Sequence, residues 1–314
     1  MVTQFAPLTA TKLRDELLTH PLMLSIGSLS LSTFMSRSIY GIVDWRPVLI
    51  CVASDILAIG MDHYFDQAPM LSYALKTGDS EMAAIFRQAK ALLFTNAGLL
   101  LFALALSPPS TWLMVMIFFG PAFVWDFKLF VFGGKQQKKA EENKDSPGKK
   151  ALTIKRIPGM KAILIGVIRG CGTFAIVNSI LARSFPAASA SFNIWNPTQI
   201  IVWSTINRAC HAVMADVRDF HEDWEKQVPT IPVLLRSVFR TKMLLTGVHL
   251  LTTFLYYYNP YIVFASLYAT VLVWALDENS PRGLYRLSFH SQTLTALLYG
   301  AVEMMKWYNS YQAM

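Results

Sequence analysis

The sequence predicts an all-α, multi-pass membrane protein, and two features of its composition predict this class. Hydrophobic residues make up 54% of the 314 residues, and the mean hydropathy is +0.38. Charged residues account for only 15% of the chain, compared with about 25% in soluble domains. The polar side chains are too few to cover a soluble globule of this length, so we expect much of the surface to face the lipid bilayer.

The apolar residues gather into runs of the length that a membrane-spanning helix needs, which is about 20 residues. Turns that contain proline, at 107–109 and 259–260, end one run and begin the next, because proline cannot continue a helix. We therefore expect a single transmembrane domain over residues 1–314, built as a bundle of about nine helices. The expected spans are 21–43, 46–62, 86–107, 109–132, 160–183, 196–215, 241–258, 260–277 and 289–307.

The two sides of the predicted bundle differ in charge. The connections on the side of the amino terminus hold most of the loop lysines and arginines, above all at 133–158, and the positive-inside rule places this side in the cytosol. Residues 133–158 are expected to form a flexible charged cytosolic loop. The first 20 residues lack the features of a signal peptide, so we expect the first span to be retained, in the plasma membrane or an endomembrane.

The net charge of +8 could also suggest a nucleic-acid partner. The basic residues, however, lie in loops between apolar runs, and no recognition motif for nucleic acid is present, so no such partner is expected. Cys51, Cys171 and Cys210 lie within apolar stretches and lack metal-ligand spacing. They are predicted to be buried free thiols.

Two clusters of aspartates lie at the cytosolic ends of predicted spans. The first cluster holds Asp55, Asp62 and Asp66. Helical residues seven and eleven positions apart point within roughly 20° of one direction, at about 100° per residue. The three carboxylates would therefore share one face if the helix continues through them. Asp55 could instead pair with Arg37 of a neighbouring helix.

The second cluster holds Asp216, Asp219 and Asp223, whose spacing again predicts a single helix face. Aligned carboxylates at membrane depth repel one another unless a cation neutralises them. Two such stripes suit Mg²⁺, which proteins bind through one or two carboxylates together with phosphate oxygens. The natural ligand is then a diphosphate, whose departing charge the metal would neutralise. The alternative is that these are ordinary solvated acids at helix ends.

The second cluster and the residues after it resemble the UbiA superfamily of intramembrane prenyltransferases. Residues 216–223 are similar to the D-x-x-D-x-x-x-D motif of that family, and residues 228–233 to its downstream Thr-Leu-Pro-Val-like stretch. The segment 152–158, which runs into 165–170, is similar to the Leu-Lys-Arg entry to the fifth helix. The first cluster is similar to the N-x-x-x-D-x-x-x-D motif, with Asp62 at the Asn position, Asp66 at the first Asp and Met70 at the third acidic position.

This resemblance implies a helix bundle around a central cavity that opens towards lipid. It implies a Mg²⁺-dependent enzyme that ionises a prenyl diphosphate, with farnesyl or geranylgeranyl diphosphate expected. Lys155 and Arg156 would bind diphosphate oxygens, or would simply be basic residues on the cytosolic side of the membrane. The implied residues are the metal ligands Asp62, Asp66, Asp216, Asp219 and Asp223, all catalytic except the supporting Asp216, and the diphosphate-binding Lys155 and Arg156.

Two departures from the family pattern bear on the reaction. Residues 67–76 lack the Asn-Lys-Pro and Arg-Pro elements of a typical aromatic prenyltransferase, and Gln227 replaces the usual Gly. We therefore favour cyclisation of the prenyl chain to a terpene, with transfer to an aromatic or other small acceptor as the alternative. A cation-coupled transporter is a third reading, but transport predicts acids near the middle of the membrane rather than at one face.

Aromatic residues could stabilise a carbocation through their ring faces, or could simply pack against lipid and neighbouring helices. The tyrosines at 256–258 are expected to lie in an interfacial belt. The histidines near the clusters could assist proton transfer, although hydrogen-bonded structural roles are the commoner use. The aromatic candidates are Tyr64, Phe65, Trp125, Phe127 and Trp203, and the histidines are His63, His211 and His221.

Overall fold

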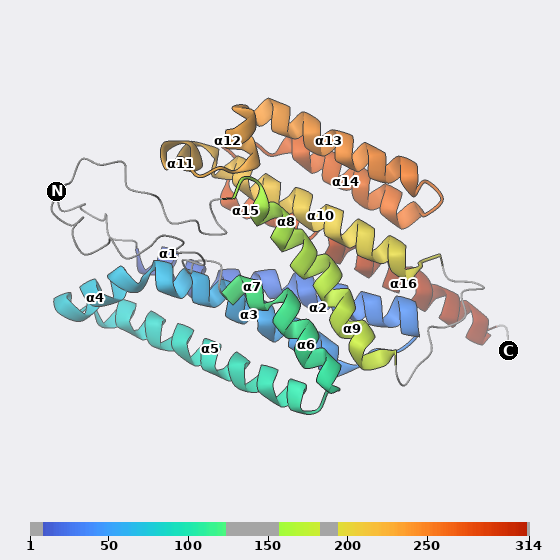
Figure 1. The fold of residues 1–314 in the computed structure, drawn as a ribbon, viewed down its shortest axis with the longest axis horizontal. Helices are drawn as coiled ribbons and strands as arrows, with labels where there is room; N and C mark the ends of the chain where they lie inside the picture. The colour runs from blue at the N-terminus through green and yellow to red at the C-terminus, as the bar shows by residue number, and fades with distance from the viewer. Residues whose placement is uncertain (1–8, 124–156, 183–193, 313–314) are drawn as a thin grey trace, which may run out of the picture.

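A computed structural model describes residues 9–123, 157–182 and 194–312 (Figure 1). All of the regular structure in these residues is helical, which confirms the predicted all-α class. The predicted charged loop at 133–158 lies outside the described residues except for its last two positions. Lys155 and Arg156, and the aromatic candidates Trp125 and Phe127, also lie outside them.

The first half of the chain forms three long helices with shorter ones around them. In chain order these elements are α1 (Ala10–Arg14), the π-helical turn η1 (Asp15–Thr19), α2 (His20–Tyr40), α3 (Trp45–Asp66), α4 (Ala68–Thr77), α5 (Ser80–Ala105), α6 (Pro109–Phe118) and α7 (Gly120–Phe123).

The second half begins with a helix that contains a π-helical turn and continues with four more long helices. Its elements are α8 (Met160–Val167), the π-helical turn η3 (Ile168–Gly172), α9 (Thr173–Leu181), α10 (Pro197–Arg218), α11 (Phe220–Glu225), α12 (Ile231–Leu235), α13 (Val238–Leu255), α14 (Pro260–Ala275), α15 (Arg282–Phe289) and α16 (Ser291–Gln312).

Every predicted span coincides with helix in the described part of the chain. By length and composition, four helical stretches are long and apolar enough to cross a membrane: Ala10–Tyr40, Trp45–Asp66, Ser80–Ala105 and Met160–Leu181. Two shorter apolar helices cover Pro109–Ala122 and Pro260–Ala275. The short helices α4, α11, α12 and α15 were not predicted, because fewer than three helical turns leave little periodic signal.

The helices form two groups with α10 between them (Figure 1). Helices α2, α3 and α5 pack side by side, whereas α13 packs against α14. Helix α10 contacts both α8 and α13, and α16 contacts both α2 and α14. The short helices α1, α4, α11 and α12 gather at one end of the bundle, which we call the rim. The C-terminus lies towards the opposite end.

Side chains fix the helix starts that the sequence predicted at the turns. The Asp44 carboxylate accepts from the Arg46 backbone N–H, at 2.8 Å from oxygen to nitrogen, and so caps α3. Asn259 caps α14 through the backbone N–H groups of Tyr261 and Ile262, directly before Pro260. The first helix of the bundle, α2, ends at Gly41, whose φ of 74° places it in the left-handed region that favours glycine.

A close helix pair ties the two groups together. A Cβ atom at Gly166 would lie 2.9 Å from Ala209 Cβ, and one at Gly170 would overlap Thr205 Oγ1. Glycines four residues apart let helix backbones approach closely in a membrane, where packing drives association. Because the residue numbers rise on one helix as they fall on the other, α8 with η3 runs antiparallel to α10.

This packing predicts a large difference between two glycine-to-alanine substitutions. Gly170→Ala should lower the free energy of unfolding by about 1–3 kcal/mol, because its methyl group would overlap Thr205. Gly98→Ala on α5 is the matched control, since nothing lies within 4 Å of its Cβ position. It should leave stability unchanged or raise it slightly. Thermal unfolding of both variants in one detergent tests this, and equal midpoints would contradict the close packing.

Candidate functional site

The acidic residues of the second cluster lie at the rim, where α10 ends. Asp216 is buried, with 1% of its surface exposed. Its Oδ1 accepts from Lys161 Nζ at 2.7 Å, so the two form an ion pair between α10 and the first turn of α8. The Lys161 side chain remains 37% exposed. Asp216 is therefore already neutralised by a residue that was not among the sequence candidates.

Asp219 marks a break in the helix. Its φ of −93° and ψ of 12° end α10, and α11 begins at the next residue. The expectation that Asp216, Asp219 and Asp223 share one face of a continuous helix is therefore wrong. The Asp219 carboxylate instead accepts two hydrogen bonds from Arg218, at 2.7 Å from Nε and 2.5 Å from Nη2.

Asp223 is the acid of this cluster with an unused oxygen. It lies on α11 and is half-buried, and its Oδ2 is buried without a hydrogen-bond partner among the described residues. Burial raises the pKa of Asp223 to about 6, and the negative charge of Asp216 acts in the same direction. A buried oxygen without a partner is costly. Its environment fits a position that a bound cation would satisfy.

The first cluster reaches the same end of the bundle. Asp62 is half-buried and Asp66 is exposed in the last two turns of α3, so the helix does continue through this cluster, beyond the predicted end of the span at 62. The hydrogen bond from Lys226 to the Glu222 carboxylate raises the pKa of Lys226. The negative charges of Asp223 and Asp66 raise it further. Asp66 and Asp223 therefore both lie within electrostatic range of Lys226 at the rim.

Both clusters have acids at the rim, but these acids do not form a finished metal site among the described residues. Within residues 9–123, 157–182 and 194–312, no group of three His, Cys, Asp or Glu side chains is placed to hold an ion. A metal ion at the rim would thus need ligands from a bound molecule. Phosphate oxygens supply such ligands for Mg²⁺, which protein carboxylates rarely enclose by themselves.

Asp55 does not belong to the rim. It is buried at mid-length of α3, where its Oδ2 lies 3.0 Å from Arg169 Nη2 and accepts a hydrogen bond from Ser28. The suggested pairing with Arg37 is wrong, because the Arg37 guanidinium donates to the backbone carbonyl of Gly41.

A second buried arginine completes this interior group. Arg208 is 1% exposed, and its Nη1 donates to the backbone carbonyl of Phe289 at 3.1 Å. Both guanidinium groups lie over the Phe289 ring, whose centroid is 4.9 Å from Arg169 Cζ and 4.6 Å from Arg208 Cζ. Sequence reasoning missed both arginines, although each interrupts an apolar run, which is the signal of a functional or paired charge inside a membrane.

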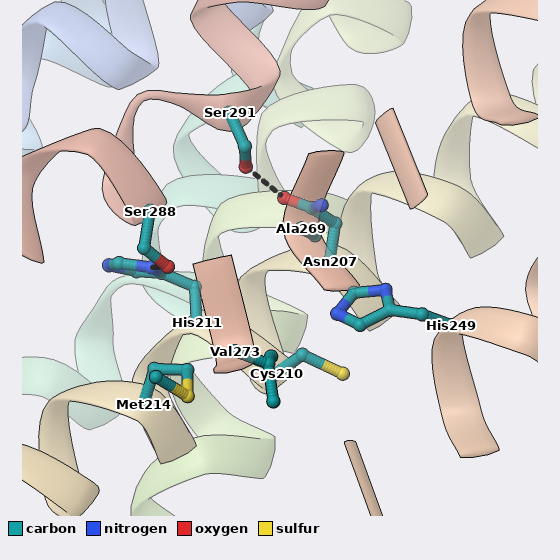
Figure 2. Close-up of a pocket in the computed structure, with 9 residues that line it drawn as sticks. All are labelled: Asn207, Cys210, His211, Met214, His249, Ala269, Val273, Ser288 and Ser291. Carbon is teal, nitrogen blue, oxygen red and sulfur yellow. Dashed lines mark hydrogen bonds between the residues drawn. The ribbon is translucent and has the colours of Figure 1, made fainter. Parts of the chain in front are cut away.

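A small polar pocket lies on another face of α10 (Figure 2). It is lined from α10 by residues at helical spacing, among them Asn207 and His211, and from the facing helices by His249 and Ser291. Ser291 donates to Asn207 Oδ1 at 3.1 Å. Its free volume of about 10 Å³ suits about one water molecule. Since Asp216 lies roughly 200° around the helix from Met214 of this pocket, the pocket is separate from the rim acids.

The aromatic and histidine candidates have contacts that structural roles explain. Trp203 is 1% exposed and packs 6.1 Å, between ring centroids, from Phe34. His211 contacts the Ser288 hydroxyl at 2.8 Å. His63 stacks edge-on against His20 at the rim, with centroids 5.2 Å apart. His63 follows Asp62 on α3, and His221 lies between Asp219 and Asp223, with its ring centroid 5.5 Å from that of Phe220.

Comparison with solved structures shows which fold this is. The chain resembles a UbiA homologue from Archaeoglobus fulgidus with a TM-score of 0.58 and 15% sequence identity, over 92% of this chain and 98% of that one. Two further structures of a UbiA homologue from that organism, bound to DMAPP and Mg²⁺ and to GPP and Mg²⁺, give TM-scores of 0.57 and 0.53, with the same identity and coverage. Neither a family model nor a curated protein matches the sequence. The chain therefore has the UbiA fold.

Proposed function

We propose that this protein is a Mg²⁺-dependent intramembrane enzyme that ionises a prenyl diphosphate at the rim. The observation that carries the proposal is the buried Asp223 oxygen that has no hydrogen-bond partner among the described residues, on a helix whose Lys226 lies within electrostatic range of Asp66 from a distant part of the chain. The structurally similar UbiA homologues bound to GPP or DMAPP with Mg²⁺ support the same chemistry.

The residues of the rim divide into metal-binding and charge-balancing groups. Asp62, Asp66, Asp219 and Asp223 would hold the metal together with diphosphate oxygens, and Lys155 and Arg156 would contact the diphosphate. Bound Mg²⁺ would neutralise the negative charge that develops on the departing diphosphate. The prenyl chain would extend into the bundle, and we place the rim in the cytosol because the basic connections lie on that side.

In this reaction the bond between the allylic carbon and the bridging oxygen breaks, and its electron pair leaves with the pyrophosphate. We propose that a double bond of the same prenyl chain then attacks the carbocation, which finally loses a proton to pyrophosphate or water and leaves a cyclic hydrocarbon. The support is the segment 67–76, which forms α4 and lacks the acceptor-side elements of aromatic prenyltransferases.

Transfer to an acceptor is the second candidate, and one structural observation favours it. A site for cyclisation needs only an apolar cavity, whereas the interior of this bundle holds Arg169 and Arg208 with three guanidinium nitrogens that lack hydrogen-bond partners among the described residues. Buried cations of this kind could hold an anionic group of an acceptor.

The first test is the release of pyrophosphate. Purified protein in detergent should release pyrophosphate from farnesyl or geranylgeranyl diphosphate when Mg²⁺ is present, and excess chelator should reduce the rate at least about a hundredfold, because the metal stabilises the departing charge by several kcal/mol. Mass spectrometry of products formed without acceptor distinguishes the two candidates. A product that forms only when an acceptor is added would exclude cyclisation, and no metal-dependent release from any chain length would exclude the proposed function.

A further inference from the structure

The ion pair between Lys161 and Asp216 uses one of the donors of the lysine. An ammonium group has three N–H donors, and among the described residues Lys161 Nζ makes one hydrogen bond, to Asp216 Oδ1. The lysine side chain is 37% exposed, whereas the aspartate side chain is 2% exposed. Asp216 is therefore enclosed by protein, whereas Lys161 is partly accessible. Lys161 also lies in the electrostatic field of Asp219 and Asp223.

Close backbone packing fixes where this lysine lies. Gly166 meets Ala209 and Gly170 meets Thr205 along the antiparallel pair of α8 with α10. Continuing the same register towards the rim brings Lys161, in the first turn of α8, beside Asp216 in the last turn of α10. The position of the ammonium group thus depends on the helix pair rather than on a loop, which is the kind of support that a binding group needs.

The same contact limits what Asp216 can do. Its carboxylate is buried and its Oδ1 contacts the lysine, so a metal ion would have to bind at Oδ2, beside a cation that already balances the charge. Asp223, in contrast, has an oxygen without a partner among the described residues. The acids of the second cluster therefore differ in role, although they lie within eight residues of one another.

We propose that Lys161 binds the diphosphate group of the substrate, and that Asp216 anchors this lysine instead of binding metal. The inference rests on the proposed function, since it assigns residues of the same site. With diphosphate bound, the two remaining N–H groups of Lys161 donate to phosphate oxygens while the third stays on Asp216.

Binding of Mg²⁺-pyrophosphate to the full-length protein, followed by thermal shift, tests this assignment without relying on turnover. Lys161→Met should weaken binding about ten- to a hundredfold, since hydrogen bonds to a charged group are lost. It should raise the KM for farnesyl diphosphate in the same proportion. Lys161→Arg keeps the charge and should retain most of the affinity.

A double variant separates binding from anchoring. Lys161→Met alone leaves Asp216 as a buried, unpaired charge, which could weaken binding through the fold. Lys161→Met combined with Asp216→Asn removes both charges, and we expect its pyrophosphate affinity to stay as low as that of the single variant. Wild-type affinity in the double variant, or in Lys161→Met itself, would overturn the assignment.

The outcome for this lysine can be told apart from that for the proposed function. If the wild-type protein releases pyrophosphate with Mg²⁺ but the Lys161→Met variant binds pyrophosphate normally, only the role of Lys161 is overturned. If the wild-type protein shows no metal-dependent release, the proposed function fails and this inference fails with it.

Discussion

Replacing Asp223 with asparagine should reduce pyrophosphate release about a thousandfold. The substitution keeps the shape of the side chain but removes the charge that would hold the metal, and a metal ion contributes several kcal/mol to the stabilisation of departing charge, at about 1.36 kcal/mol for each factor of ten in rate. Asp66→Asn should have an effect of similar size, because Asp66, at the end of α3, is the other proposed metal ligand within electrostatic range of Lys226.

Glu222→Gln provides the matched control for this prediction. Glu222 neighbours Asp223 on α11, carries the same charge and is exposed, where it pairs with Lys226. Its loss should leave the rate within about a factor of two, since exposed ion pairs contribute little. The rates are measured as released pyrophosphate at saturating Mg²⁺. Near-normal rates in Asp223→Asn would remove it from the site, and an equally slow Glu222→Gln would show that general rim charge matters instead.

Asp55→Ala should destabilise the folded protein more than any of the other substitutions proposed above. Asp55 is the carboxylate that balances Arg169 inside the bundle, and Arg208 also lies in its field. Removing one partner of a buried ion pair costs about 3–5 kcal/mol, because the remaining charge is left without compensation. We expect a strongly lowered unfolding midpoint in detergent, or loss of folded protein from the membrane.

A charge-free double variant shows whether compensation is the cause. Asp55→Ala together with Arg169→Met removes both members of the pair and should recover part of the lost stability. Should the double variant be no more stable than Asp55→Ala, the energy would come from packing and not from the ion pair. Glu222→Gln again serves as the reference for an exposed pair, with an expected loss of at most about 1 kcal/mol.

Hydrophobic runs and prolines were sufficient to predict the positions of the long helices. Each run is long and almost free of charge, and the turn predicted at 259–260 separates α13 from α14, which Asn259 caps. The break at Asp219 could not be predicted in the same way. Its spacing to Asp216 and Asp223 is compatible with a continuous helix, and the change of direction into α11 depends on tertiary contacts that a local pattern does not contain.

The sequence could not predict which charged residues of the site form pairs with one another. Spacing placed the acids on common ends of the helices, but it could not show that Lys161 neutralises Asp216 or that Arg169 neutralises Asp55. Both pairs join helices far apart in the chain. Which cation lies opposite which acid depends on the register of packed helices, and glycines such as Gly166 and Gly170 determine that register by their small size.

The contacts of Arg208 have a consequence for how the chain is made. Arg208 donates to Phe289, and the adjoining residues hold α10 through Ser291 to Asn207 and through Gln292 to the Ser204 carbonyl. These partners lie 81, 84 and 88 residues further along the chain, so they are synthesised after α10. During biogenesis its guanidinium is therefore expected to depend on water or insertion factors, and early termination ahead of α15 would leave a nascent chain with an unshielded cation in lipid.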